Sequence, residues 1–383
     1  MKPQISLLAV IAIAIGTTVQ ALAADIKVGM VTSLSGPAAS LGIPYANGLR
    51  AGLAYKPEIA GRKVQLIVLD DASDPTVARR NATKLVLEDK VDILIGAATV
   101  PSTFAMAGYG RETSTPLIAI SPVSLAGDAS AWVVTVVQPA SLMIGAVVEQ
   151  MRKSGVKTVA FIGFADAAGD LFYEALAESA KAAGIQIVAN ERYARADASV
   201  TGQVLKIVAL RPDAVLDGGT GTPGALPVIA LAERGYKGGV YGTHGLINAD
   251  FIRVAGSAAQ GLVVPTGPVI VAEQLAPESG IRKTALDFRA VYERTQGAAS
   301  TDAFSAYAFD AWLVFADAAG RALVAAEPGT PAFRNALRDA IASSKEVVGT
   351  HGVYNFSPKS PYGVDERARV IVRLDKGQWK LVP

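Results

Sequence analysis

The residues best suited to chemistry in this sequence are two histidines and one pair of adjacent carboxylates. His244 and His351 lie far apart, and neither has acidic residues at a spacing typical of metal ligands. Asp70 and Asp71 follow an apolar run, where two carboxylates suggest a metal site or, more often, a solvated turn before a helix. The chain contains no cysteine, which excludes thiol catalysis, iron–sulfur clusters and disulfides. These residues therefore predict no metal site and no catalytic set.

Motifs for phosphate binding and for ester hydrolysis are also missing. Gly218–Gly224 is rich in glycine and follows an apolar run, but it lacks the lysine of a P-loop. The segment Met30–Pro37 after the first apolar run is not a GxGxxG turn, and the chain has no GxSxG elbow. The sequence thus favours a protein that binds a small molecule without converting it and uses no cofactor; an exported enzyme is the weaker alternative.

The elements that must position such a site follow an alternating pattern of strands and helices along the chain. Apolar runs such as Ile26–Leu34 and Lys63–Leu69 are each followed by a helical segment, here Ala39–Tyr55 and Pro75–Glu88. Short turns of Gly, Pro and Asp separate them, which favours parallel sheets with helices on both faces. The pattern runs through two rounds of roughly 110–130 residues, so we predict an α/β fold with two doubly wound, Rossmann-like lobes.

Long helical stretches and further strands follow these two rounds and must pack on sheets already formed. Because no Pro- or Ser-rich linker separates the rounds, the chain is expected to cross between the lobes several times and to form a hinge. We expect the N-terminal lobe to comprise residues 24–137 and 268–346, and the C-terminal lobe to comprise residues 138–267 and 347–383.

The N-terminus has the pattern of a cleaved export signal. Lys2 precedes the apolar run Leu7–Ile15, and Ala21–Ala23 supplies the small residues that a signal peptidase recognises. The run is too short to span a bilayer, although a retained short anchor is an alternative. We therefore predict a signal peptide over residues 1–23, cleavage near Ala23 and export of the mature chain.

The balance of basic and acidic residues limits the kinds of molecule that this protein can bind. Lys and Arg total 36 and Asp and Glu total 34, so the formal net charge is +2. This near-balance excludes the broad basic surface that nucleic-acid binding needs. We expect a monomer that binds a small molecule.

Ligands of open α/β sheets bind at the carboxyl ends of the strands, where this chain has loops of small and hydroxylated residues. Their backbone N–H groups and hydroxyls form neutral hydrogen-bonding sites, and helix N-termini there favour an anion. Helix capping remains the simpler role for any single Ser or Thr. The loops are Ser33–Leu41, Ala97–Thr103, Ser121–Leu125, Phe164–Asp170, Gly218–Pro223 and Thr243–Ile247.

Several of these segments resemble the branched-chain-amino-acid-type substrate-binding proteins of ABC transporters, which have the type I periplasmic binding protein fold. The resemblance covers essentially the whole mature chain. Its markers are Leu34–Gly42, Asp70–Pro75, Ile95-Gly96 and Ile120–Pro122. Further stretches are similar to the subgroup that binds aromatic acids such as hydroxycinnamates and benzoates: Gly155–Val159, Arg192–Arg195, Glu233–Gly238, Thr243–Gly245 and Val348–Val353.

The resemblance implies two lobes that close on a solute in the cleft between them. In the amino-acid binders, loops of one lobe hold the carboxylate and an acidic residue of the other lobe holds the ammonium. That acidic position falls at His244, and an imidazole cannot neutralise an ammonium group, whose unpaired burial is costly. The resemblance therefore predicts that an α-amino acid is a poor ligand; a structural role for His244 stays open.

Other positions carried over from the family depart from its pattern. Leu41 and Ala168 stand where aromatic residues are usual, and a large side chain is missing near Thr220 and Gly221, which predicts a roomier site for a flat ligand. Three hydroxyl positions fall at apolar residues, with neighbouring hydroxyls as possible substitutes. The ligand-binding candidates are Leu41, Thr99, Val100, Ser102, Ser121, Val123, Ser124, Leu125, Ala168, Thr220, Gly221 and His244.

The function expected from this resemblance is that of a periplasmic receptor for an ABC importer. It would capture an apolar or aromatic carboxylic compound and deliver it to the membrane permease subunits. Two alternatives stay open: a receptor for branched-chain or other hydrophobic amino acids, and a sensor that presents its ligand to a membrane signalling receptor.

Overall fold

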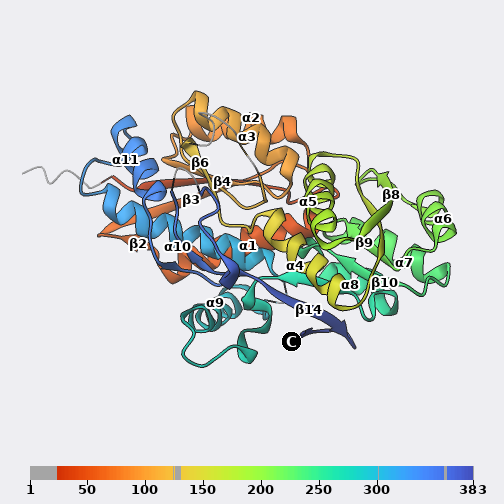
Figure 1. The fold of residues 1–383 in the computed structure, drawn as a ribbon. Coiled ribbons are helices and arrows are strands. Elements are labelled where there is room, and N and C mark those ends of the chain that lie inside the picture. Colours follow the sequence, from red (N-terminus) through yellow and green to blue (C-terminus); the bar gives the residue numbers. More distant parts are fainter. Residues whose placement is uncertain (1–23, 124, 126–130, 301, 358–359, 383) are drawn as a thin grey trace, which may run out of the picture.

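The computed structural model describes residues 24–123, 125, 131–300, 302–357 and 360–382. These residues form two large sheets with helices packed around them, together with a short two-stranded sheet (Figure 1). The predicted signal peptide, residues 1–23, lies outside the described residues. Within the described part, no helix is both long enough and apolar enough to cross a bilayer.

The first sheet has six strands in the order β2-β3-β1-β4-β5-β6. All neighbours are parallel except β2 and β3. The central strands β1 and β4 are buried almost throughout, as expected for a parallel sheet covered on both faces. The strands are β1 (Ile26–Thr32), β2 (Glu58–Ile59), β3 (Arg62–Asp70), β4 (Ile93–Gly96), β5 (Leu117–Ala119) and β6 (Val133–Thr135).

The second sheet has seven strands in the order β15-β14-β11-β10-β9-β7-β8. Strands β7 to β11 run parallel, whereas the C-terminal strands β14 and β15 add an antiparallel edge. The strands are β7 (Thr158–Phe164), β8 (Gln186–Tyr193), β9 (Ala214–Gly218), β10 (Gly239–Gly242), β11 (Val263–Thr266), β14 (Val370–Asp375) and β15 (Gln378–Leu381). The small third sheet pairs β12 (Val347–Val348) with β13 (Val353–Tyr354).

The first lobe is built on the first sheet. One of its helical layers contains α1, which packs along α10 and beside α9. In the second lobe, built on the second sheet, α4 packs against α5. The α-helices are α1 (Ala39–Tyr55), α2 (Pro75–Leu87), α3 (Val100–Glu112), α4 (Ala140–Lys153), α5 (Ala167–Ala183), α6 (Thr201–Leu210), α7 (Ala225–Glu233), α8 (Ala249–Ala255), α9 (Gly280–Gln296), α10 (Phe304–Ala322) and α11 (Pro331–Ala342). Short 3₁₀-helices include η2 (Thr222–Gly224), η3 (His244–Leu246), η4 (Gly256–Ala259), η5 (Pro268–Gln274) and η6 (Glu366–Ala368).

A buried polar cluster ties together the segments that connect the two sheets. Asp310 on α10 accepts hydrogen bonds from the backbone N–H groups of Thr350 and His351, at 2.6 and 3.0 Å. The Tyr354 hydroxyl lies 2.8 Å from Asp310 Oδ2 and 2.9 Å from the carbonyl oxygen of Val136, in the segment between β6 and α4. Burial raises the pKa of Asp310 to about 6. The connections therefore pack as one hinge, while the proposed lobe boundaries at residues 137, 267 and 346 stay predictions.

The carboxylate pair at the end of β3 lies at a turn before α2, as the sequence favoured, and Asp70 is half-buried, but Asp71 is not solvated. Asp71 is fully buried and accepts a hydrogen bond from the Ser33 hydroxyl at 2.7 Å. Asp70 accepts from the backbone N–H of Leu34 at 2.8 Å and from the Ser35 hydroxyl at 2.6 Å. Both carboxylates thus hold the loop after β1, because its backbone donors would otherwise lack partners. They are structural residues of this loop.

Candidate functional site

The carboxyl ends of the two parallel sheets face each other across a cleft. In the first sheet the strand order reverses beside β1 and β4, and in the second it reverses beside β7 and β9. Such switch points open a crevice that commonly binds ligands. The loops and first helical turns after these four strands supply Leu41, Thr99, Ala168 and Thr220 to one cavity between the lobes. Topology therefore places the candidate site in this cleft.

The cavity between the lobes is small and almost closed. Its volume is about 30 Å³, enough for a water molecule or two. Leu41 of the first lobe packs so closely on Gly221 of the second that a Cβ atom at Gly221 would lie 2.2 Å from Leu41 Cδ1. The two lobes are thus in direct contact, and the structure shows a closed cleft.

Larger hollows lie on the surface. One of about 590 Å³ lies at the rim of the cleft, is lined by both lobes and shares Arg195 with the cavity. A hollow of about 510 Å³ lies beside Asp302 and Trp379, and one of about 270 Å³ lies beside Trp132. Neither of these two lies where the switch points of both sheets converge, so the cleft cavity is the better candidate despite its size.

Seven of the twelve ligand-binding candidates line this cavity, although their contact with a solute stays a prediction. They are Leu41, Thr99, Val100, Ser121, Ala168, Thr220 and His244. Ser124 lies outside the described residues. The other four candidates, which are Ser102, Val123, Leu125 and Gly221, do not line it.

Local geometry explains where these four residues go. After Pro122 the chain turns away from the cleft, and the carbonyl oxygen of Val123 accepts a hydrogen bond from the Tyr362 hydroxyl at 2.7 Å. Val123 and Leu125 line a separate small hollow beside β6. Ser102 is fully buried on the first turn of α3, and its side chain lies next to the Asp71 carboxylate. Gly221 packs against Leu41 across the cleft and so does not line the cavity itself.

Arg195 is the main functional candidate that sequence reasoning missed. It follows β8, its side chain is 15% exposed, and it lines both the cavity and the rim hollow. Its Nε donates to Asp166 Oδ2 at 2.6 Å and its Nη1 donates to Thr220 Oγ1 at 3.2 Å. The guanidinium also lies 3.9 Å from the centre of the Phe164 ring. These contacts hold a cation at the edge of the cavity, in a geometry suited to an anion.

His244 contributes a neutral imidazole to the wall from the second lobe. It begins η3 after β10, it is 3% exposed, and burial lowers its pKa to about 4. Its ring meets that of Phe172 edge-on, with centroids 5.9 Å apart. Nδ1 of His244 is buried and has no hydrogen-bond partner among the described residues. A buried polar atom without a partner is costly unless a ligand or water satisfies it.

The second histidine belongs to the hinge and not to the cavity wall. His351 stacks on Tyr307 with ring centroids 3.7 Å apart, and its Nε2 lies 3.0 Å from the carbonyl oxygen of Ala303. Burial lowers its pKa to about 3. The two histidines therefore have different roles, and in the described part of the chain no group of three His, Asp or Glu side chains is arranged to hold a metal ion.

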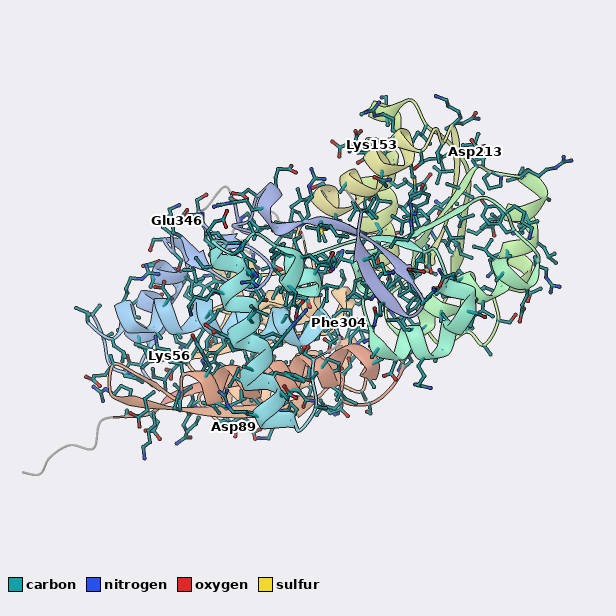
Figure 2. All side chains as sticks on the ribbon, turned by 90° about the horizontal axis from the view of Figure 1, so that it is seen from below. Lys56, Asp89, Lys153, Asp213, Phe304 and Glu346 are labelled. Carbon is teal, nitrogen blue, oxygen red and sulfur yellow. The ribbon has the colours of Figure 1, made fainter. Side chains whose placement is uncertain are left out.

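Three aromatic rings line the cavity from positions that the sequence comparison with the family did not single out. Tyr45 comes from α1, Phe172 from α5 and Phe304 from the start of α10. Tyr45 and Phe304 meet edge to face with centroids 5.3 Å apart. Figure 2 shows Phe304 in the middle of the molecule, between the two lobes. The wall therefore has aromatic rings from helices, although Leu41 and Ala168 bring none, and the roomier site for a flat ligand stays a prediction.

Hydroxyl groups and a helix N-terminus complete the wall on the first lobe. Thr99 is the N-cap of α3, where its hydroxyl accepts from the backbone N–H of Ser102 at 3.3 Å. The Ser121 hydroxyl lies 2.7 Å from that of Thr103, which also contacts the carbonyl oxygen of Thr99 at 2.9 Å. The N-terminus of α3 thus faces the cavity, and its dipole favours negative charge there.

Comparison with known proteins places the chain in a family. The profile of the periplasmic binding protein family matches residues 25–360. The Leu/Ile/Val-binding protein BraC3 of Rhizobium johnstonii is 26% identical over 251 residues, which span 63% of this chain and 67% of that protein.

Solved structures agree with this assignment. An extracellular ligand-binding receptor from Rhodopseudomonas palustris is 39% identical, with a TM-score of 0.91 over 94% of this chain and 100% of that one. A solute-binding protein of an ABC transporter from R. palustris, in complex with benzoate, is 22% identical, with a TM-score of 0.74 over 94% of this chain and 95% of that one.

The fold, the cleft and the family match describe the same kind of molecule. The matched residues include the whole first sheet and strands β7 to β11 of the second, and of the described strands only the edge strands β14 and β15 follow them. The family consists of receptors that bind a solute without converting it. This chain belongs to the periplasmic binding protein family, as a non-enzymatic, periplasmic solute-binding receptor of the ABC-transporter type.

Proposed function

We propose that this receptor captures an aromatic or other apolar carboxylate, such as a hydroxycinnamate or a benzoate, and delivers it to the permease subunits of an ABC importer. One observation carries the proposal. Arg195 lines the cavity, and among the described residues that line the cavity none is acidic. A wall with a cation and no carboxylate suits an anion, whereas the ammonium group of an amino acid would be buried without a partner.

The carboxylate of the solute is proposed to bind at Arg195. Nε of Arg195 is held by Asp166, and the guanidinium keeps further donors on the cavity side, one of which now donates to Thr220. A planar guanidinium with several donors pairs well with a carboxylate. The hydroxyl of Ser121 and the N-terminus of α3 supply neutral donors from the other lobe, so closure places the anion between both lobes.

The apolar body of the solute is proposed to lie among the rings of Tyr45, Phe172 and Phe304. Aromatic pairs arranged edge to face stabilise one another beyond the area that they bury. Nδ1 of His244 lacks a partner among the described residues, and a hydroxyl group on the ring of the solute would provide one. Because burial keeps this imidazole neutral, it forms a hydrogen bond without adding charge.

Binding requires the lobes to separate and then to close on the solute. The cavity of about 30 Å³ cannot hold a benzene ring in the side-chain arrangement of this structure. We propose that Phe172 changes rotamer when the solute enters, since its ring is rotatable at the cavity, while Arg195 keeps its contact with Asp166. The solute then stabilises the closed state through contacts that the open state lacks.

The comparisons support the chemistry of this proposal only in part. A structural neighbour is complexed with benzoate, but at 22% identity it supports the fold. The relative BraC3 is named for leucine, isoleucine and valine, which keeps a branched-chain amino acid as the second candidate. We further propose that the mature receptor begins after Ala23 and acts as a monomer.

A thermal-shift panel separates the two candidates. Purified mature protein is heated with hydroxycinnamates and benzoates and, in parallel, with leucine, isoleucine and valine. A solute at about 100 times its Kd stabilises the folded state by about 2.7 kcal/mol, which is a clear shift in Tm. We expect the aromatic acids to give the larger shift. A larger shift with leucine would overturn the aromatic-acid proposal.

A further inference from the structure

We propose that Asn248 and Ser40 form a latch between the lobes, which stabilises the closed state and thereby sets the affinity for every solute to the same extent. The proposal rests on the proposed function in one respect: closure of the cleft accompanies binding. Neither residue lines the cavity among the described wall residues, so both act as positioning residues. The latch would tune affinity and leave solute selectivity to the cavity wall.

Two hydrogen bonds make up the latch, and both cross from one lobe to the other. Nδ2 of Asn248, on the second lobe, donates to the carbonyl oxygen of Ser40 on the first lobe at 2.6 Å. The Ser40 hydroxyl accepts from the backbone N–H of Thr222, again on the second lobe, at 3.1 Å. Asn248 is 2% exposed, whereas Ser40 is half-buried at the rim hollow, so the bond is partly shielded from competing water.

The sequence of α1 explains why the Ser40 carbonyl is free to bond across the cleft. In a regular helix this oxygen would accept from the N–H of the residue four positions later. That residue is Pro44, which lies inside α1 and has no N–H. The carbonyl oxygen therefore lacks its usual helical partner and bonds to Asn248 when the lobes close. The bond to Asn248 is lost when the lobes separate.

The side chain of Asn248 is held ready for this contact by its own lobe. As the N-cap of α8, it accepts a hydrogen bond at Oδ1 from the backbone N–H of Phe251, at 3.1 Å. Only one orientation of the amide satisfies both partners, because Phe251 offers a donor and Ser40 offers an acceptor. Thr222 begins the turn η2, where its N–H has no partner inside that turn. Both second-lobe groups are thus fixed before the lobes meet.

Substitutions at Asn248 can remove the latch while they keep the helix cap. Asn248→Ser retains an acceptor for Phe251, but its side chain is too short to reach Ser40. Asn248→Asp also retains the acceptor and replaces the donor with a carboxylate that faces a carbonyl oxygen. Ser40→Ala removes the second bond alone, and Pro44→Ala returns a helical donor to the Ser40 carbonyl. Thr330→Ala, which removes the N-cap of α11 away from the cleft, is the matched control for helix capping.

The first measurement is the affinity of each variant for two unlike solutes that bind the wild type. One uncharged hydrogen bond corresponds to about a 2- to 10-fold change in Kd. We expect Asn248→Ser to raise both Kd values by the same factor in this range through faster dissociation, with Asn248→Asp raising them more. Thr330→Ala should lower Tm without changing Kd. Equal or tighter binding by both Asn248 variants would overturn the proposal.

The second measurement needs no solute and so separates failure of the latch from failure of the proposed function. Because the chain has no cysteine, Lys56→Cys and Lys153→Cys would accept a pair of dyes on different lobes (Figure 2). Energy transfer between the dyes reports the distribution of distances between the lobes. We expect Asn248→Ser to shift the solute-free protein towards open distances and Thr330→Ala to leave it unchanged. An unchanged distribution in Asn248→Ser would overturn the latch even if aromatic acids bind as proposed.

Discussion

The substitution Arg195→Met should abolish most of the affinity for a carboxylate while leaving the fold intact. Methionine keeps much of the apolar stem that packs on the Phe164 ring and removes the guanidinium. Asp166 would lose its partner at 2.6 Å, but it still accepts hydrogen bonds from the backbone N–H groups of Ala168 and Gly169 as the N-cap of α5. Because these two backbone donors remain, the cost to the free energy of unfolding should be about 1 kcal/mol.

The expected effect on binding is much larger than the effect on stability. Removing one partner of a buried, hydrogen-bonded charge pair costs about 2–5 kcal/mol. Asp166 and Thr220 already share the guanidinium, which offsets part of its attraction for the solute. We take a value in the lower half of the range, about 3 kcal/mol, which corresponds to roughly a 100-fold rise in Kd.

The assay compares each aromatic acid with its uncharged amide by calorimetric titration. Wild-type protein should prefer the acid by a factor similar to the loss in Arg195→Met, and the variant should bind both forms weakly and about equally. Arg192→Met is the matched control, because it removes the same kind of side chain from a neighbouring position at the end of β8. Arg192 pairs with Asp170 at 3.2 Å and does not line the cavity.

One pattern of results would refute this reasoning. If Arg195→Met bound the acid as tightly as the wild type while Arg192→Met lost affinity, the carboxylate would not bind where the cavity wall places a cation. Equal affinity of the wild type for acid and amide would have the same meaning, since it would show that the charge of the solute contributes nothing to binding.

Three further predictions concern other residues of the cleft and the second sheet. His244→Leu should leave the Tm of the free protein unchanged or slightly raised, because Nδ1 has no partner to lose among the described residues, yet it should weaken the binding of hydroxylated aromatic acids. Unchanged affinity would return His244 to a structural role. Gly221→Ala should raise Kd, since its Cβ would lie 2.2 Å from Leu41 Cδ1 in the closed cleft, and should also lower Tm, because φ of Gly221 is +57°; equal affinity would contradict the close contact. Asp217 has a pKa that burial raises from 3.8 to about 8, so its contribution to stability is present in acid and is lost as the pH rises from about 4 through 8. The Tm of Asp217→Asn minus that of the wild type should therefore grow between about pH 4 and pH 8, and a difference that is constant with pH would contradict the burial of this carboxyl group.

The framework of the fold follows directly from the sequence. Alternating apolar runs and helical segments predict the two parallel sheets, and the long C-terminal helical stretches match α9, α10 and α11. The switch-point rule then brings the loops with Leu41, Thr99 and Thr220 to one cleft, because parallel strands place their carboxyl ends at the same edge of a sheet. What the pattern predicts well is thus the edge at which a ligand binds.

The details of the cavity wall depend on the direction in which each loop and side chain points, which the sequence pattern does not determine. Val123 and Leu125 lie in a loop at the correct edge, but the chain turns after Pro122 and points them away. Tyr45 and Phe304 are apolar residues on helices, and their spacing is indistinguishable from that of ordinary core residues. Only the packing of α1 against α10 shows that these rings reach the cleft.

Arg195 illustrates the same limit for a charged residue. A lone arginine after a strand is most often a surface residue, and nothing local distinguishes it from Arg192. The distinction arises from tertiary contacts, since Asp166 and the Phe164 ring hold Arg195 over the cavity whereas Arg192 packs over Phe161. Asp71 likewise is a buried structural carboxylate only because Ser33, which follows a different strand, reaches it.

The most direct test of the central claim is a calorimetric titration of the mature wild-type protein with a hydroxycinnamate, followed by recovery of the solute. We expect saturable binding with one site per chain, release of the solute in unaltered form and no saturable binding of leucine. Saturable binding of leucine without binding of the aromatic acid, or conversion of the acid into a product, would contradict the account.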